Sequence, residues 1–127
     1  MSKTIRKRAA RRSVDRHGKE ITLRNYENGG TDSDFAGGWS ETTASPHTIQ
    51  ARAYTTTSGQ TDRGARDAGE GDFDRLFIIR DDADGVSNIR DGGGQGATQI
   101  DEQGDTWYVV FMDQQDNGVI RLECNSQ

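Results

Sequence analysis

The chain is poor in residues that cross-link a protein or anchor it in a membrane. Its 127 residues include a single cysteine, Cys124, which excludes an internal disulfide framework. No stretch is long and apolar enough to predict a membrane-spanning helix or the core of a signal peptide. We therefore expect a soluble protein without membrane contact, made in a reducing cytoplasm.

Large apolar side chains are also scarce. Hydrophobic residues make up 30% of the chain, well below the share that is usual for a globular protein. A single domain of this length then has only a thin core to offset the entropy that it loses on folding. Pairing with neighbouring subunits is the expected additional source of stability.

Lysine is the third scarce residue. The chain has 3 Lys against 13 Arg, and 15 Asp against 6 Glu. Such a composition suits high salt, because screening there weakens the repulsion between surface carboxylates. We interpret it as a halophilic signature, and an ordinary acidic surface is the alternative.

The charge is divided unevenly along the chain. Residues 1–16 carry +6 and, since the whole chain carries −5, residues 17–127 carry −11. The basic residues of this N-terminal arm are Lys3, Arg6, Lys7, Arg8, Arg11, Arg12 and Arg16. We expect a basic arm, 1–16, followed by one domain, 17–127.

The arm is the one segment whose composition predicts binding. It lacks Gly and Pro, so it can form a short helix when docked on a partner, whereas in isolation it should fray. Its charge suits nucleic acid or an acidic protein face. High salt weakens attraction to phosphate, which favours a protein groove where Arg makes close bidentate contacts. The alternative is a disordered, solubilising tail.

The rest of the chain has strand character, with alternating or β-branched runs. The predicted strands are Glu20–Tyr26, Thr48–Thr55, Phe73–Arg80, Ala97–Asp101, Thr106–Met112 and Val119–Cys124. The Asn117-Gly118 pair and the Glu102–Asp105 segment are typical of hairpin turns. The sequence therefore predicts a C-terminal three-stranded antiparallel meander within an all-β fold.

Three long polar, Gly-rich stretches separate these strands: Asn28–Ser45, Thr56–Asp72 and Asp81–Gly96. Loops of this length are uncommon in a compact domain unless they are functional or disordered. Much of the chain is thus predicted to lie outside the core.

No motif predicts chemistry. Asp82-Ala83-Asp84-Gly85 begins like a calcium loop, but Ser87 and Gly93 stand where the pattern needs Gly and Glu. The Gly92–Gly96 run has no following Lys, as a phosphate loop requires. The two histidines, His17 and His47, have no partner at ligand spacing, and no base lies near Cys124 in the sequence. We expect a protein that is not an enzyme and that uses no cofactor or resident metal, although a loosely held cation at the Asp-rich turn stays open.

The order of features resembles that of the head-closure, or head–tail stopper, family of long-tailed viruses. The resemblance covers about residues 19–125. It rests on the succession of four motifs: Gly38-Trp39-Ser40-Glu41, Ile49-Gln50-Ala51-Arg52-Ala53, Gly104-Asp105 with Trp107-Tyr108-Val109-Val110, and Val119–Cys124 with its Gly118. The basic arm and the Asp81–Gly96 insertion depart from the family pattern.

The resemblance implies a small antiparallel β-barrel or sandwich that forms a homo-oligomeric ring, usually twelve-fold. Such a ring lies at the head–tail neck of the virion, below the portal or adaptor and above the tail-terminator or tail-tube protein. It helps retain the packaged DNA, and a long loop reaches into the channel. The composition would suit a virus of a halophilic archaeon, assembled in the host cytoplasm. The channel-loop candidates are Gly59, Asp62, Arg63, Gly64, Arg66, Asp67, Gly69 and Glu70.

Three other functions compete with this one. A tail-completion or minor capsid-decorating β protein shares the virion setting. A nucleic-acid-binding barrel would need basic residues among its exposed aromatics, and Thr106–Met112 has none. An acidic metal-binding module is disfavoured by the broken calcium pattern.

Overall fold

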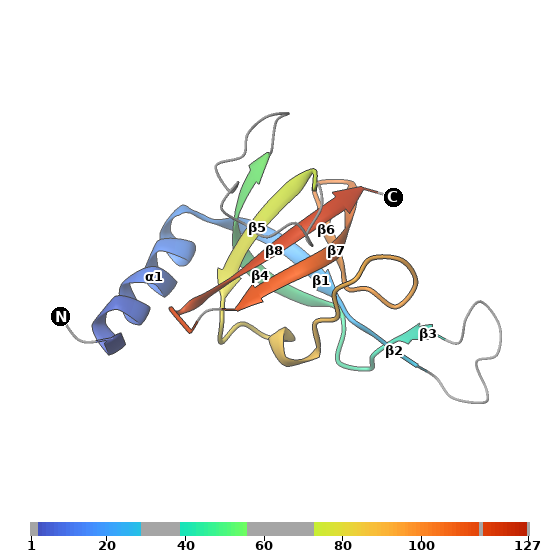
Figure 1. Ribbon diagram of the computed structural model, residues 1–127, viewed down its shortest axis with the longest axis horizontal. Coiled ribbons are helices and arrows are strands. Elements are labelled where there is room, and N and C mark those ends of the chain that lie inside the picture. The colour runs from blue at the N-terminus through green and yellow to red at the C-terminus, as the bar shows by residue number, and fades with distance from the viewer. Residues whose placement is uncertain (1–2, 29–38, 56–72, 115, 127) are drawn as a thin grey trace.

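One helix and eight strands make up the described part of the chain. The computed structural model describes residues 3–28, 39–55, 73–114 and 116–126. The elements are α1 (Lys3–His17), β1 (Lys19–Arg24), β2 (Tyr26–Asn28), β3 (Trp39–Glu41), β4 (His47–Thr55), β5 (Arg75–Arg80), the 3-10 turn η5 (Val86–Asn88), β6 (Gln99–Glu102), β7 (Asp105–Gln114) and β8 (Val119–Ser126). Figure 1 shows the helix at one end of the molecule and the β2–β3 pair at the other.

Six strands close into an antiparallel barrel in the order β1-β4-β5-β8-β7-β6, and β6 pairs back to β1. Alternate residues point inward, so that Ile21 faces Ile49 across one pair and Phe77 faces Leu122 across another. The core consists of Ile21, Leu23, Ile49, Ala51, Phe77, Ile79, Ile100, Val109, Ile120, Leu122 and Cys124. The predicted all-β fold is confirmed, and closure gives each described barrel strand a neighbour on both sides.

The predicted C-terminal meander is confirmed as β6-β7-β8. Gln103 and Gly104, both with positive φ, make the first turn. Gly118 makes the second, and a Cβ atom there would lie 2.6 Å from the Lys7 carbonyl oxygen. Glycine is therefore required at 118 by its φ of 96° and by the approach of α1.

The strand predicted over Glu20–Tyr26 is divided at Asn25. Asn25 is fully buried; its backbone N–H donates to Ser45 Oγ (2.9 Å) and its Nδ2 donates to the Gly85 carbonyl (2.9 Å). Its Oδ1 accepts a hydrogen bond from Thr98 Oγ1 at 2.8 Å. The chain leaves the barrel at this polar junction, and β2 then pairs with β3 as a separate two-stranded sheet.

The N-terminal segment differs from the expected frayed arm. Residues Lys3–His17 form a helix that lies against β4, β5 and β8. Val14 is only 1% exposed, and the Gly18 N–H donates to the Val14 carbonyl (2.8 Å) where the chain enters β1. The helix packs on its own chain, because the barrel covers Val14 and the turns next to β5 and β8 supply the acidic partners Asp81 and Asp116.

Candidate interaction surfaces

The inner face of α1 uses its cations to hold the helix on the barrel. Lys7 pairs with Asp116 (2.6 Å), and Arg11 pairs with Asp81 (2.8 Å) at the end of β5. The Arg52 guanidinium donates to Ser13 Oγ at 2.9 Å. Two of the predicted docking residues, Lys7 and Arg11, therefore have partners within the chain.

The carboxylate of Asp15 also helps to hold α1 on the barrel. Arg80, the last residue of β5, binds both Asp15 of the helix and Asp82 of the following turn. The hydrogen bond from Arg80 holds the pKa of Asp82 below its ordinary value, against the opposing effect of partial burial. Asp82 is thus engaged by an arginine, which argues against its use as a cation ligand.

The outer face of α1 carries three arginines that we call the arginine row: Arg8, Arg12 and Arg16. They are spaced by four residues, so they lie on one side of the helix, about 6 Å apart along its axis. All three are exposed, and none makes an ion pair with any residue in the described part of the chain. The remaining predicted docking residues, Lys3 and Arg6, lie in the first turn of the helix.

A buried ionic cluster joins three strands near one end of the barrel. Glu102 of β6 has a side chain only 5% exposed and accepts hydrogen bonds from both ends of the Arg75 guanidinium, with Nε–Oε1 at 2.9 Å. Lys19 of β1 binds the same carboxylate. Desolvation raises the pKa of Glu102, but the hydrogen bonds from Arg75 and Lys19 outweigh it and leave the pKa below its ordinary value. Every charge has a partner here, so the cluster is a structural clamp.

The end of the molecule farthest from α1 carries an aromatic hollow of about 500 Å³. Tyr26, Trp39, Gln99 and Tyr108 line it together with the Gly94–Gly96 segment. The Trp39 ring lies against Gly96, where a Cβ atom would come within 2.7 Å of the indole. The guanidinium of Arg90 stacks over the same indole at 4.7 Å. This end of the protein therefore already holds an arginine by cation–π contact.

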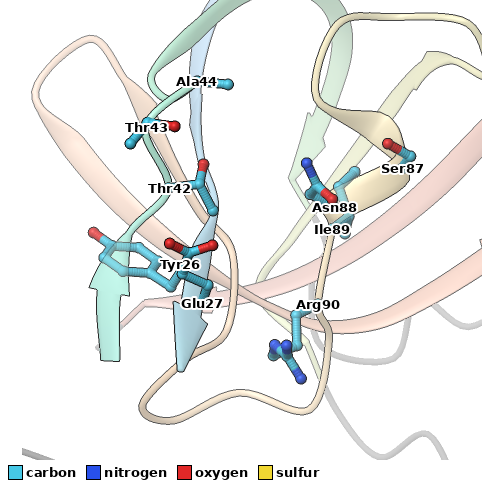
Figure 2. Close-up of a pocket in the computed structure, with 9 residues that line it drawn as sticks. All are labelled: Tyr26, Glu27, Thr42, Thr43, Ala44, Ser87, Asn88, Ile89 and Arg90. Carbon is cyan, nitrogen blue, oxygen red and sulfur yellow. The ribbon is translucent and has the colours of Figure 1, made fainter. Parts of the chain in front are cut away.

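A second hollow, of about 460 Å³, shares Tyr26 with the first. Figure 2 shows one wall formed by Tyr26, Glu27 and Thr42–Ala44, and the facing wall formed by residues Ser87–Arg90. Glu27 is exposed on β2 and makes no ion pair with a described residue. We call the residues Tyr26, Glu27, Trp39, Gln99 and Tyr108 the aromatic end.

Carboxylates surround the aromatic end on the barrel side. Among the described residues, Arg24 binds two of them, with Nε 2.7 Å from Asp101 and Nη1 3.3 Å from Glu41. Burial, and next the negative charge of Glu41, raise the pKa of the Tyr26 hydroxyl. The end thus combines ring faces with more acidic than basic groups.

The structure bears on the discounted motifs as well. Cys124 is buried in the barrel, and burial raises the pKa of its thiol. Among the described residues, no group of three His, Cys, Asp or Glu side chains is arranged to hold a metal ion. None of the described helices is long and apolar enough to span a membrane. The predicted channel loop, Thr56–Asp72, lies outside the described residues.

Sequence reasoning missed the aromatic end, although its parts were visible. Trp39 and Tyr108 stand in two of the motifs that carried the resemblance, and Tyr26 closes a predicted strand. The pairing of β2 with β3 places Trp39 near Tyr26, and the barrel pairing of β1, β6 and β7 brings Tyr108 to the same hollow. Comparison of the chain with protein-family models finds no match, and a search of curated proteins finds no similar one.

Proposed function

We propose that this chain is a structural, non-catalytic virion protein of the head-closure type. It forms a ring at the head–tail neck, joins the portal or adaptor to the tail, and helps retain the packaged genome. The observation that carries the proposal is the arginine row. Its cations are exposed, whereas Lys7 and Arg11 on the other face of the helix already form ion pairs with acidic residues of the same chain. The closed antiparallel barrel and the resemblance to head-closure proteins support it.

The closed barrel limits how such a subunit can associate. Each of the six described barrel strands has a hydrogen-bonded neighbour on both sides over part of its length, which leaves only short strand ends for adding a strand from a partner. We therefore expect contacts between subunits to be made by side chains and appended elements, of which α1 is the largest among the described residues. Arginines one helical turn apart suit carboxylates of a protein partner, which they can bind in bidentate fashion.

The test is binding to virus heads that carry portal and adaptor but lack this protein. We expect the wild-type protein to co-sediment with such heads in high salt and to protect their DNA from nuclease. The variant R8E/R12E/R16E should lose both effects while keeping its circular dichroism spectrum. The variant R8K/R12K/R16K keeps the charge and should show intermediate binding, because Lys lacks the planar guanidinium.

Two results would contradict the proposal. One is a wild-type protein that does not bind heads at all. The other is tight, salt-resistant binding to naked DNA that R8E/R12E/R16E abolishes, which would favour a nucleic-acid-binding barrel.

A further inference from the structure

The arginine row and the aromatic end lie at opposite ends of the molecule. In Figure 1, α1 projects from one side of the barrel and the β2–β3 pair from the other. Two different surfaces placed this way form a heterologous contact when one copy meets the next, and such contacts build rings when the rotation closes. Each surface would then be used once in every subunit.

The chemistry of the two surfaces is complementary. The row offers guanidinium groups that lack an acidic partner among the described residues. The aromatic end offers the rings of Tyr26 and Tyr108, and Arg90 over Trp39 shows the contact that a guanidinium makes there. A hollow of about 500 Å³ falls within the usual size of a binding site, and a single arginine side chain fits such a space.

The charges agree with this pairing. Glu27 is exposed on the wall of the neighbouring 460 Å³ hollow, which shares Tyr26 with the aromatic hollow. Among the described residues, Glu41 and Asp101 both pair with Arg24. An incoming arginine would supply the missing positive charge. Contacts of this kind also suit concentrated salt. The screening length is about 3 Å at 1 M, so salt weakens distant charge pairs much more than pairs in direct contact.

We propose that the arginine row of one copy docks on the aromatic end of a second copy, and that this head-to-tail contact builds the ring. The proposal rests on the proposed function for the ring itself and adds its subunit interface. Arg8, Arg12 and Arg16 face the acidic and aromatic groups of the neighbour, with Glu27 as an ion-pair partner and Tyr26 and Tyr108 as stacking surfaces.

Two variants block the two surfaces separately. R8E/R12E/R16E reverses the row, and E27K/Q99K places like charge where a guanidinium would enter. A matched control, D105K/Q103K, makes the same kinds of substitution on the exposed β6–β7 turn. Sedimentation velocity over protein concentrations up to about 1 mM reveals even millimolar contacts, and circular dichroism shows whether each variant is folded.

The decisive measurement is the mixture of the two blocked variants. We expect concentration-dependent association of the wild type and of the control, and monomers for each blocked variant alone. Mixed in equal amounts, the two variants should form a one-to-one dimer that grows no further, because only one intact surface remains on each partner.

Any of the following outcomes would overturn the inference: a wild type that stays monomeric, association of E27K/Q99K equal to that of the wild type, or a mixture that contains no dimer. A dimer formed by one blocked variant alone would likewise overturn it, since it indicates a two-fold contact of like surfaces. Head binding separates this failure from that of the proposed function, because a wild type that fails to self-associate but still seals heads uses another ring interface.

Discussion

Arginines meet carboxylates in two very different surroundings in this protein. Near one end of the barrel, the Arg75 side chain is 15% exposed and donates hydrogen bonds to Glu102, which Lys19 also binds. On the helix, Arg11 is 31% exposed and reaches Asp81 at the surface. The first contact joins β1, β5 and β6, and the second orients α1 on the barrel wall. The difference shows that the same pair of groups can fix a fold or merely position an element, depending on how much water it excludes.

The strongest test of this comparison removes one partner of the buried cluster. Arg75→Ala leaves the Glu102 carboxylate buried with only Lys19 to bind it, and we expect the free energy of unfolding to fall by about 3 kcal/mol. Denaturant unfolding in high salt measures it. The double variant R75M/E102L removes both charges and should lose much less. Equal losses in the single and double variants would show that packing of the Arg75 side chain, rather than its charge, matters.

The pH dependence of stability is a second test of the buried contact between Arg75 and Glu102. The folded protein holds the pKa of Glu102 below its ordinary value of 4.5, so this group stabilises the fold above that pH, and the contribution is lost as the pH falls through the depressed value. We expect Glu102→Gln to be less stable than the wild type at neutral pH, and the two unfolding curves to converge in acid. Glu20→Gln, at an exposed position of β1, serves as the control and should run parallel to the wild type.

The smallest effect is expected on the outer face of α1. R8Q/R12Q/R16Q should change the free energy of unfolding by no more than about 0.5 kcal/mol, because these side chains have no acidic partner among the described residues. Lys7→Gln, which removes a surface ion pair with Asp116, should cost up to about 1 kcal/mol. Thermal unfolding measures both. A large loss from the row variant would mean that these arginines serve the fold and not a partner.

Much of the barrel was predictable from residue patterns. Alternation over 119–124 and 48–55, and the Asn117-Gly118 turn, correctly placed strands and the final hairpin, because a half-buried strand must alternate. The three-residue strand β3 escaped prediction, since Trp39–Glu41 is too short to show a period. The four-residue spacing of Arg8, Arg12 and Arg16 was also visible, but nothing in the sequence says which side of a helix meets the barrel.

The two candidate surfaces were likewise predictable only in part. The sequence marked the whole basic arm as one binding segment, whereas the structure separates Lys7 and Arg11, which hold the helix, from the arginine row. The aromatic end unites residues more than eighty positions apart, Tyr26 and Tyr108. The predicted channel role of residues 56–72 stays a prediction.

Residue patterns are enough to predict the β character, the closing meander and the separation of a basic segment from an acidic domain, because local periodicity and composition depend only on neighbouring residues. Tertiary structure decided which cations are satisfied within the chain and which face outward. It also decided that three distant rings form one hollow. Those properties depend on closing the barrel and docking the helix, and both steps bring together groups whose contact no local pattern encodes.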